Sequence, residues 1–320
     1  MKRMIVALLV GICAVAQAQD LPEQIKDLAP VLESQKEFAD GMRAWGKTEI
    51  ATATGDLDEA KTLLRKRMPD EAKAKKQSAV DRVKKVREAY EFALAKYAND
   101  ATLHNAYGEL LYDQFGDNAG ALREWNLATS LDNKYAPPYN NLGLDQCHTG
   151  DYAIGVKNLE RALELDPKNP DFMFNLAQIY IVNAPQVAEI KKWKPKKVYD
   201  HAMKLSKEAT ELDASDYQLA EDYAMNFFAA ERFDVEADWA KAAEAWQRAR
   251  PLAGRADRTA LTWMNEARCW IRAEKPQQAR PCLEEVLKIV PESAVAKQLI
   301  DSIDHPQPGD NAKKPKKHKK

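Results

Sequence analysis

Apolar and small residues recur along most of the chain with a period close to 34 residues. One position holds a small residue in successive units, at Gly108, Gly143, Ala177, Ala224 and Ala267. A second position, in the alternate segments, holds Ala93, Ala128, Ala162, Ala209, Ala249 and Val286. Around them, apolar residues such as Leu142 and Leu159 have the spacing of one helical face. The pattern therefore predicts pairs of antiparallel helices that repeat along the chain.

Turn signals separate the predicted helices. Gly116-Asp117 and Gly150-Asp151 lie between the helices of a pair, and Pro167, Pro251 and Pro291 lie where second helices should end. A small residue lets a partner helix approach closely, and a single hairpin cannot bury its own apolar face. Stacked hairpins cover one another, which predicts a curved solenoid whose concave side consists of first helices.

The clearest unit, at residues 136–180, can be compared with a known repeat. It contains Tyr139-x-x-Leu142-Gly143 and Asp166-Pro167, and the next unit begins with Met173-x-x-Leu176-Ala177-x-x-Tyr180. Over residues 101–290 the chain resembles the tetratricopeptide repeat (TPR) family, although Gln146 and Gly155 replace the Tyr and Ala of its pattern. The resemblance implies an all-α fold, a right-handed superhelical solenoid of stacked antiparallel helix pairs that binds protein or peptide partners.

The flanks of the repeats are divided by composition. We predict a leading helix over 19–40, broken near Asp40-Gly41, and a divergent first pair that ends at residue 98. In that pair, Met42–Ala53 is followed by a break at Thr54-Gly55-Asp56, a charged segment, and a helix over Asp81–Tyr97. The repeats then occupy 99–303, with a capping helix at Glu292–Ile303. Residues 304–320 are Lys-rich and are expected to be disordered.

The first 18 residues have the features of a secretory signal peptide. Lys2 and Arg3 precede the apolar stretch Met4–Ala16, and Ala16-Gln17-Ala18 is a cleavage signal. We expect cleavage after Ala18 and a periplasmic or secreted protein. The apolar stretch is shorter than the roughly 20 residues of a membrane span, and no later segment is long and apolar enough, so no transmembrane helix is expected.

Charge and motifs limit the possible functions. The chain has 48 Lys and Arg against 49 Asp and Glu, a net charge of -1, which gives no reason to expect a general nucleic-acid binder. We expect no sequence-specific nucleic-acid partner. Residues 19–303 hold 40 positive and 47 negative charges, or -7, so an acidic body precedes a basic tail. The sequence has no G-x-S-x-G, H-E-x-x-H, Gly-rich phosphate loop or C-x-x-C. We therefore expect no catalytic residues, no metal site and no cofactor.

Amide side chains mark the predicted concave groove. Asn141, Asn175 and Asn265 lie two residues before the small residue of a first helix, and Asn105 lies nearby. The TPR resemblance implies that such amides hydrogen-bond an extended peptide, with Tyr139 and Gln146 beside them. The alternative is that they satisfy a neighbouring helix end or water. Asp171 and Asn175 stand where a clamp for C-terminal carboxylates would need cations, which argues against that specialised use.

Two lysine clusters suggest a second kind of contact. The first is Lys191, Lys192, Lys194, Lys196 and Lys197 around Trp193, and the second includes Lys313, Lys314, Lys316 and Lys317. The first could dock on an anionic membrane surface or an acidic partner, with the indole at the interface. The second could bind lipid headgroups, anionic glycans or nucleic acid without sequence specificity. The alternatives are a solvated loop whose Trp193 packs back on the protein, and a solubilising tail.

Three cysteines follow the predicted signal peptide. Cys269 and Cys282 lie at similar distances from a predicted turn and are a possible disulfide, although Cys269 lies off the apolar face of its helix. Such a bond would stabilise the protein by roughly 3 kcal/mol. Cys147 is predicted to be a small packed residue.

Together the features of the sequence predict an exported, non-enzymatic scaffold that binds protein or peptide. The alternatives are an envelope-surface anchor and an accessory subunit of a larger envelope complex.

Overall fold

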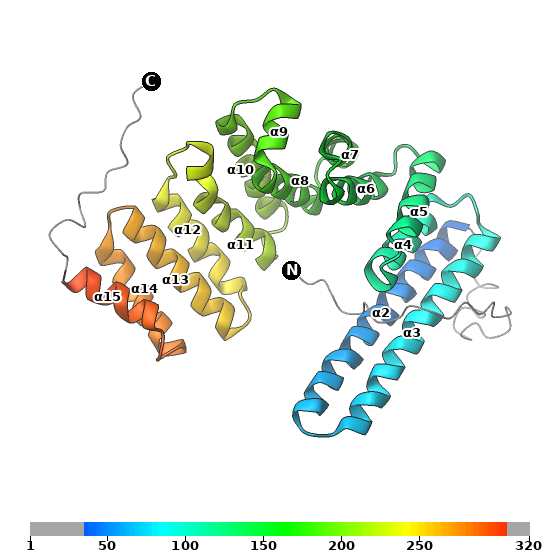
Figure 1. Cartoon of the computed structure of the whole chain (residues 1–320), viewed down its shortest axis with the longest axis horizontal. Helices are drawn as coiled ribbons and strands as arrows, with labels where there is room; N and C mark the ends of the chain where they lie inside the picture. Colours follow the sequence, from blue (N-terminus) through cyan, green and yellow to red (C-terminus); the bar gives the residue numbers. More distant parts are fainter. Residues whose placement is uncertain (1–34, 306–320) are drawn as a thin grey trace. The chain divides into compact units, whose positions relative to one another are not determined.

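The computed structural model describes residues 35–305, which form helices and turns and contain no strand. The all-α prediction is therefore confirmed for this part of the chain. The described residues divide into two compact units, one made of residues 35–150 with 157–166 and the other of 151–156 with 167–305 (Figure 1). The predicted signal peptide, most of the predicted leading helix and the lysines at 313–320 lie outside the described residues.

The first unit begins with a long helical hairpin. Helices α2 (Gln35–Arg65) and α3 (Pro69–Lys96) pack against each other along their length. Their seam consists mainly of buried small residues at seven-residue intervals: Ala39, Gly46, Ala53 and Ala60 on α2, and Ala72, Ala79, Val86 and Ala93 on α3. A seven-residue repeat keeps one stripe of each helix facing its partner, and small side chains let the two backbones approach closely.

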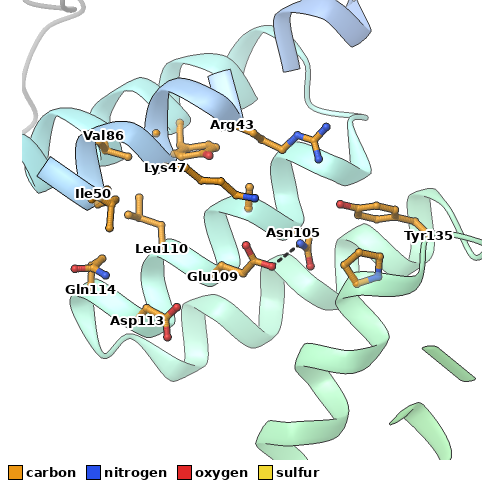
Figure 2. A pocket seen from close by; sticks show the side chains of 15 residues that line it. Arg43, Lys47, Ile50, Val86, Asn105, Glu109, Leu110, Asp113, Gln114 and Tyr135 are labelled. Atoms are coloured by element: carbon orange, nitrogen blue, oxygen red, sulfur yellow. Dashed lines mark hydrogen bonds between the residues drawn. The ribbon is translucent and has the colours of Figure 1, made fainter. Parts of the chain in front are cut away.

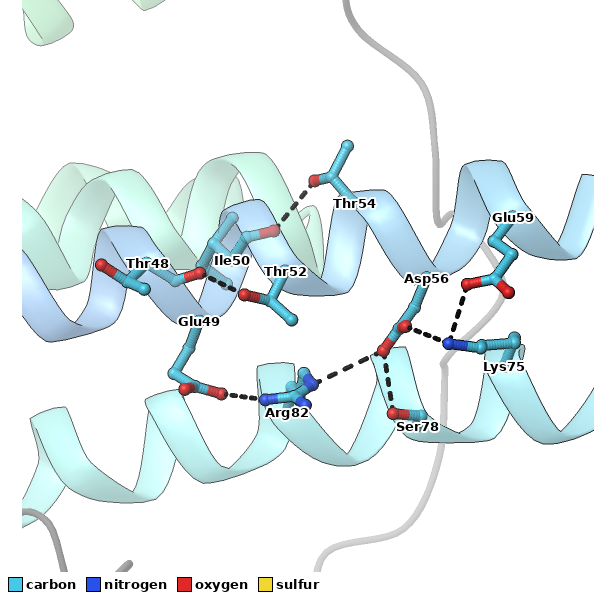
Figure 3. A network of polar contacts seen from close by, with 10 residues as sticks. All are labelled: Thr48, Glu49, Ile50, Thr52, Thr54, Asp56, Glu59, Lys75, Ser78 and Arg82. Carbon is cyan, nitrogen blue, oxygen red and sulfur yellow. Dashed lines mark hydrogen bonds and ion pairs between the residues drawn. The ribbon is translucent and has the colours of Figure 1, made fainter.

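The breaks predicted at Asp40-Gly41 and Thr54-Gly55-Asp56 are wrong, because α2 continues through both. Helix α3 also begins earlier than predicted, at Pro69 instead of Asp81. A glycine inside a helix costs about 1 kcal/mol, and contacts with α3 offset that cost. Figure 3 shows the polar contacts beside the expected break, where Ser78 Oγ donates to Asp56 Oδ2 at 2.9 Å and Arg82 Nη1 donates to Glu49 Oε2 at 2.7 Å.

The remainder of the first unit has the predicted helix-pair pattern. Helix α4 (Ala101–Leu110) continues through a π-helical turn, η1 (Leu111–Phe115), and packs on α5 (Asn118–Leu131). Helix α6 (Ala136–Thr149) follows, and α7 (Tyr152–Leu165) contributes residues to both units. A Cβ on Gly108 would lie 2.5 Å from Trp125 Nε1, so the close approach predicted at this position is confirmed.

The second unit stacks further pairs in sequence. Helix α8 (Pro170–Val182) packs on α10 (Pro195–Leu212), and α11 (Tyr217–Asn226), α12 (Trp239–Ala249), α13 (Ala256–Arg272) and α14 (Pro276–Ile289) follow, each against the next. A short 3-10 turn, η3 (Arg250–Leu252), follows α12. Helix α15 (Ala294–Asp304) covers α14 and corresponds to the predicted capping helix.

Two inserted elements account for the longer repeat spacing in the second unit. Helix α9 (Ala184–Lys191) lies between α8 and α10 and was not among the predicted helices. The 3-10 segment η2 (Phe227–Phe233) follows α11. The small positions of the second helices are all buried as expected: Ala93, Ala128, Ala162, Ala209, Ala249 and Val286. The repeat register predicted from the sequence therefore holds although the spacing varies.

Candidate binding pocket

A pocket of the first unit lies between the α2–α3 hairpin and α4. Its volume is about 490 Å³. The apolar part of its lining comes from three helices, through Ile50 of α2, Val86 of α3 and Leu110 of α4. Figure 2 shows the polar side chains around this lining, among them Asn105, Gln114 and Tyr135.

The two sides of this pocket carry opposite charges. Arg43 and Lys47 come from α2, and Glu109 and Asp113 come from α4 and η1 (Figure 2). Arg43 also pairs with Asp40 on its own helix. Lys47 is exposed and has no ion pair within residues 35–305. A ligand with both a carboxylate and a cation or amide donor matches this arrangement, whereas a purely apolar ligand leaves the charges unused.

Tyr90 forms a buried aromatic wall of the pocket beside a glycine of α2. A Cβ on Gly46 would lie 3.1 Å from the Tyr90 hydroxyl oxygen, so the absence of a side chain there brings the hairpin close to this ring. Burial raises the pKa of Tyr90 well above its ordinary value, and the charge of Glu109 acts in the same direction. The hydroxyl is therefore neutral at physiological pH and can donate or accept a hydrogen bond.

The structure brings together two of the asparagines predicted to line the groove. Asn141 Nδ2 donates to Asn105 Oδ1 at 3.1 Å and to Glu109 Oε1 at 3.1 Å, and Asn105 Nδ2 donates to Glu109 Oε1 at 2.9 Å. Asn105 is buried, and its backbone carbonyl accepts a bond from Trp125 Nε1 at 3.3 Å. These amides therefore join α4 to α6 and hold the Glu109 carboxylate at the pocket.

The other predicted groove residues take different positions. Tyr139 donates from its hydroxyl to Asn133 O at 3.4 Å, and Gln146 Oε1 accepts from Asn158 Nδ2 at 2.8 Å. Neither residue lines the pocket. Asn175 is half-buried on α8. Asn265 is buried on α13, where its Oδ1 accepts from Arg268 Nη1 at 3.1 Å.

A polar cluster in the second unit was missed by the sequence analysis. Ser206 Oγ and Asn226 Nδ2 donate to Asp222 Oδ2 at 3.2 and 3.1 Å, and Gln178 Nε2 donates to Asp222 Oδ1. Burial raises the pKa of Asp222 from 3.8 to about 7, against the opposing effect of the Ser206 and Asn226 hydrogen bonds. Asp222 lies two residues before Ala224, the position that holds Asn141, Asn175 and Asn265 in other units, so a signal was present.

The charged residues of the pocket were also missed, for two reasons. Glu109 follows a small repeat residue directly, and the repeat pattern by itself gives that position no function. Arg43 and Lys47 lie on the hairpin, which is outside the repeat register and was predicted to be broken. No repeat pattern could therefore have placed these cations opposite Glu109.

The lysine cluster of residues 191–197 does not present its tryptophan outward. The Trp193 ring lies 4.3 Å from the His201 ring and 6.1 Å from the Tyr180 ring, centroid to centroid, and Lys197 Nζ lies 4.4 Å from its centroid. The indole thus packs against α10 and α8, as the alternative interpretation expected. Lys192, Lys194, Lys196 and Lys197 are exposed, and Lys196 pairs with Asp200 at 2.9 Å.

The cysteines at 147, 269 and 282 are buried free thiols in the structure, so the possible Cys269–Cys282 disulfide is not formed there. The Cys282 thiol donates along its own helix to Gln278 O at 3.4 Å. Burial raises the pKa of Cys269 to about 12 and that of Cys147 to about 11. These thiols are therefore protonated at neutral pH and unreactive as nucleophiles.

Residues 35–305 contain neither a metal-ligating cluster nor a membrane-spanning helix. No group of three or more His, Cys, Asp or Glu side chains there is arranged to hold a metal ion. None of the helices in this range combines the length and apolar character needed to cross a bilayer.

Comparison with known proteins agrees with the repeat assignment. Residues 158–192 match the family model of the tetratricopeptide repeat. The C-terminal part of a TPR repeat-containing protein from Cytophaga hutchinsonii is similar in structure, with 14% identity, 82% of this chain and 98% of that chain covered, and a TM-score of 0.52. No curated protein matches the sequence significantly.

Two other solved structures show weaker likeness. YrrB, described as a TPR protein with an unusual peptide-binding site, is 20% identical over 66% of this chain and 97% of that chain, with a TM-score of 0.48. Pseudomonas aeruginosa pilF is 16% identical over 78% and 97%, with a TM-score of 0.46. The family match and the likeness to the Cytophaga structure confirm the predicted TPR resemblance and the stacked helix-pair fold.

Proposed function

We propose that this protein is a non-enzymatic scaffold that binds segments of partner proteins, and that the pocket between the α2–α3 hairpin and α4 is one of its binding sites. The observation that carries the proposal is the pocket itself, with Arg43 and Lys47 facing Glu109 and Asp113 around an apolar lining. Peptides combine apolar side chains with main-chain donors and acceptors, and this mixture suits such a lining.

The hydrogen bonds at the pocket support the recognition of a ligand. Glu109 is held by two amides, an arrangement that fixes an acceptor in place for a ligand donor. We accordingly assign Glu109 to the recognition of main-chain or side-chain donors, with Asn105 holding its carboxylate in place, and Lys47 to the recognition of an acidic group.

The proposal is tested with peptides selected from a displayed random library against the whole protein. Affinities for the selected peptides are then measured by fluorescence anisotropy for the wild type, Lys47→Glu and Glu109→Gln. We expect each variant to weaken binding by about tenfold, since each removes one charge-assisted contact. Lys84→Glu, on an exposed site of α3 that does not line the pocket, serves as the matched control and should bind as the wild type does.

Three results would contradict the proposal. They are the selection of no peptide, equal affinities in all four proteins, and an equal loss in the Lys84→Glu control. Circular dichroism of each variant separates a loss of binding from a loss of folding.

We further propose that the protein is exported and works in the periplasm or outside the cell. The support is the sequence of residues 1–18, with Lys2 and Arg3 before the apolar stretch and Ala16-Gln17-Ala18 after it. Cell fractionation with amino-terminal sequencing tests this directly. A mature protein that begins at Gln19 is the expected result, and an intact amino terminus in the cytoplasm would overturn the proposal.

A further inference from the structure

The turn that joins α2 and α3 presents two apolar side chains among cations. We define the hairpin tip as residues 61–76. Within it, Leu64 is 47% exposed and Met68 is 37% exposed. Arg65, Lys66 and Arg67, which separate these two residues, are also exposed. The tip therefore combines an apolar pair with a basic run in one turn.

The hairpin tip is strongly basic in a chain whose body is acidic. It contains seven Lys or Arg and two Asp or Glu, a net charge of +5. Residues 19–303 carry -7 in total, so the same span without the tip carries -12. Lys61 pairs with Asp58 at 2.7 Å and Lys75 with Glu59 at 2.8 Å. No ion pair within the described range involves Arg65, Lys66 or Arg67, so their charges are available.

The backbone of the turn favours a different residue from the one present. Arg67 has a φ of 61°, in the left-handed region, and it ends α2 with a paired backbone cap: Met68 N donates to Leu63 O and Arg67 N to Leu64 O, both at 3.0 Å. Glycine or asparagine is the usual residue at this position. The same conformation occurs at Lys192, Asp234 and Glu274, so helix ends of this chain accept a charged residue at this position.

The hairpin places its tip away from the rest of the first unit. Helix α2 has 31 residues, which corresponds to a length of about 46 Å. Figure 1 shows the turn at the end of the hairpin that is remote from α4. The small-residue seam and the polar contacts among Glu49, Asp56 and Arg82 hold the two helices together towards the tip (Figure 3). The tip can thus reach a flat surface without obstruction from α4.

We propose that the hairpin tip docks on an anionic membrane surface. Arg65, Lys66 and Arg67 contact lipid phosphates, and Leu64 and Met68 enter the interface between headgroups and acyl chains. A nucleic acid would use the charges but would gain little from two exposed apolar side chains. A stable protein partner needs about 800 Å² of each surface, more than a narrow helical turn supplies.

The test is sedimentation of the whole protein with vesicles of phosphatidylcholine and phosphatidylglycerol in equal parts, at low salt. In the charge variant, Arg65→Gln, Lys66→Gln and Arg67→Asn are combined, because asparagine tolerates the positive φ. We expect its partition coefficient to fall by about 200-fold, since each of the three interfacial cations contributes close to a factor of six. A Leu64→Ser, Met68→Ser variant should lose about tenfold.

A matched control separates the tip from the carboxyl-terminal lysines. Lys313→Gln, Lys314→Gln and Lys316→Gln remove the same charge elsewhere, and this variant should keep at least a third of the wild-type partition coefficient. Binding lost in this variant and retained in the tip variant would overturn the proposal. The proposal would also be overturned if the Leu64→Ser, Met68→Ser variant bound vesicles as well as the wild type, because a purely electrostatic contact is not membrane docking.

Binding of library-selected peptides should be unchanged in all tip variants. Failure of the membrane-docking proposal is therefore distinguishable from failure of the peptide-binding proposal.

Discussion

At the scale of single residues, two glycines inside helices differ in what an added methyl group would contact. Gly108 lies inside α4, where a Cβ would meet the Trp125 ring, and Gly55 lies inside α2, where a Cβ would meet nothing within 4 Å. Both are helical glycines, so their helix propensities are the same. The difference lies entirely in what surrounds them, and it gives a prediction with its own control.

We expect Gly108→Ala to lower the free energy of unfolding by about 1–3 kcal/mol, because the Trp125 ring must move to admit the methyl group. Gly55→Ala should raise it by about 0.5–1 kcal/mol, since alanine reduces the freedom of the unfolded chain and meets no obstacle. Urea unfolding followed by tryptophan fluorescence measures both. Equal effects in the same direction would show that the packing around Gly108 is not as tight as described.

At the scale of elements, the α2–α3 hairpin relies on few large side chains. The buried part of its seam between residues 53 and 79 consists of the alanines Ala53, Ala60, Ala72 and Ala79. Such small residues bury little apolar area, so polar contacts contribute a larger share of the local stability. Asp56 is central to them, because it accepts from Ser78 and lies beside both Lys75 and Arg82.

We therefore predict a local effect of Asp56→Ala. Amide hydrogen exchange in residues 51–84 should become about tenfold faster, which corresponds to the loss of one or two hydrogen bonds. Exchange in α4 and α5 should not change, since they do not contact Asp56. Asp58→Ala, which removes an exposed pair with Lys61, is the matched control and should have little effect. A uniform increase over the first unit would contradict a local role for Asp56.

At the scale of the whole molecule, two buried titratable groups give both units the same pH dependence. In the first unit, His104 lies between Glu124 Oε2, 2.6 Å from its Nδ1, and Ala98 O, 2.8 Å from its Nε2. Burial lowers the pKa of His104, but the hydrogen bonds to Glu124 and Ala98 outweigh burial and raise it above 6.5. This stabilisation is complete below pH 6.5 and is lost as the pH rises through the pKa of the folded state.

In the second unit, Asp222 acts in the same direction by a different cause. Its pKa is about 7 when folded and 3.8 ordinarily, because burial opposes its charge. The folded state keeps a proton that the unfolded state releases, so the stability of this unit falls as the pH rises from about 4 to about 7. Glu221 is the neighbouring charge, and it also favours the protonated form.

Thermal unfolding between pH 4 and pH 9 should accordingly show the highest stability on the acidic side of neutrality. Asp222→Asn carries no titrating charge, and we expect it to gain roughly 2–4 kcal/mol relative to the wild type between pH 4 and pH 8. His104→Gln should instead lose stability at pH 5 and little at pH 9. If the stability of both variants changed with pH in parallel with that of the wild type, neither Asp222 nor His104 would determine the pH dependence of stability.

The sequence by itself determined the helix pairs and their register. Burial of one face of each helix requires apolar residues at fixed spacing, so positions such as Ala128, Ala162 and Ala209 were predictable and are buried. It also indicated the capping helix and, through Asn105 and Asn141, part of the candidate site. These features depend on local periodicity, which a single chain displays directly.

Tertiary structure alone decided the continuity of α2, the position of Trp193 and the composition of the pocket. Gly55 is a break signal that contacts with α3 override, and Trp193 packs on residues of two helices. Lys47 and Glu109 are 62 residues apart in the chain and line one pocket. Contacts of this kind depend on how elements pack across the unit, and no spacing along the chain specifies them.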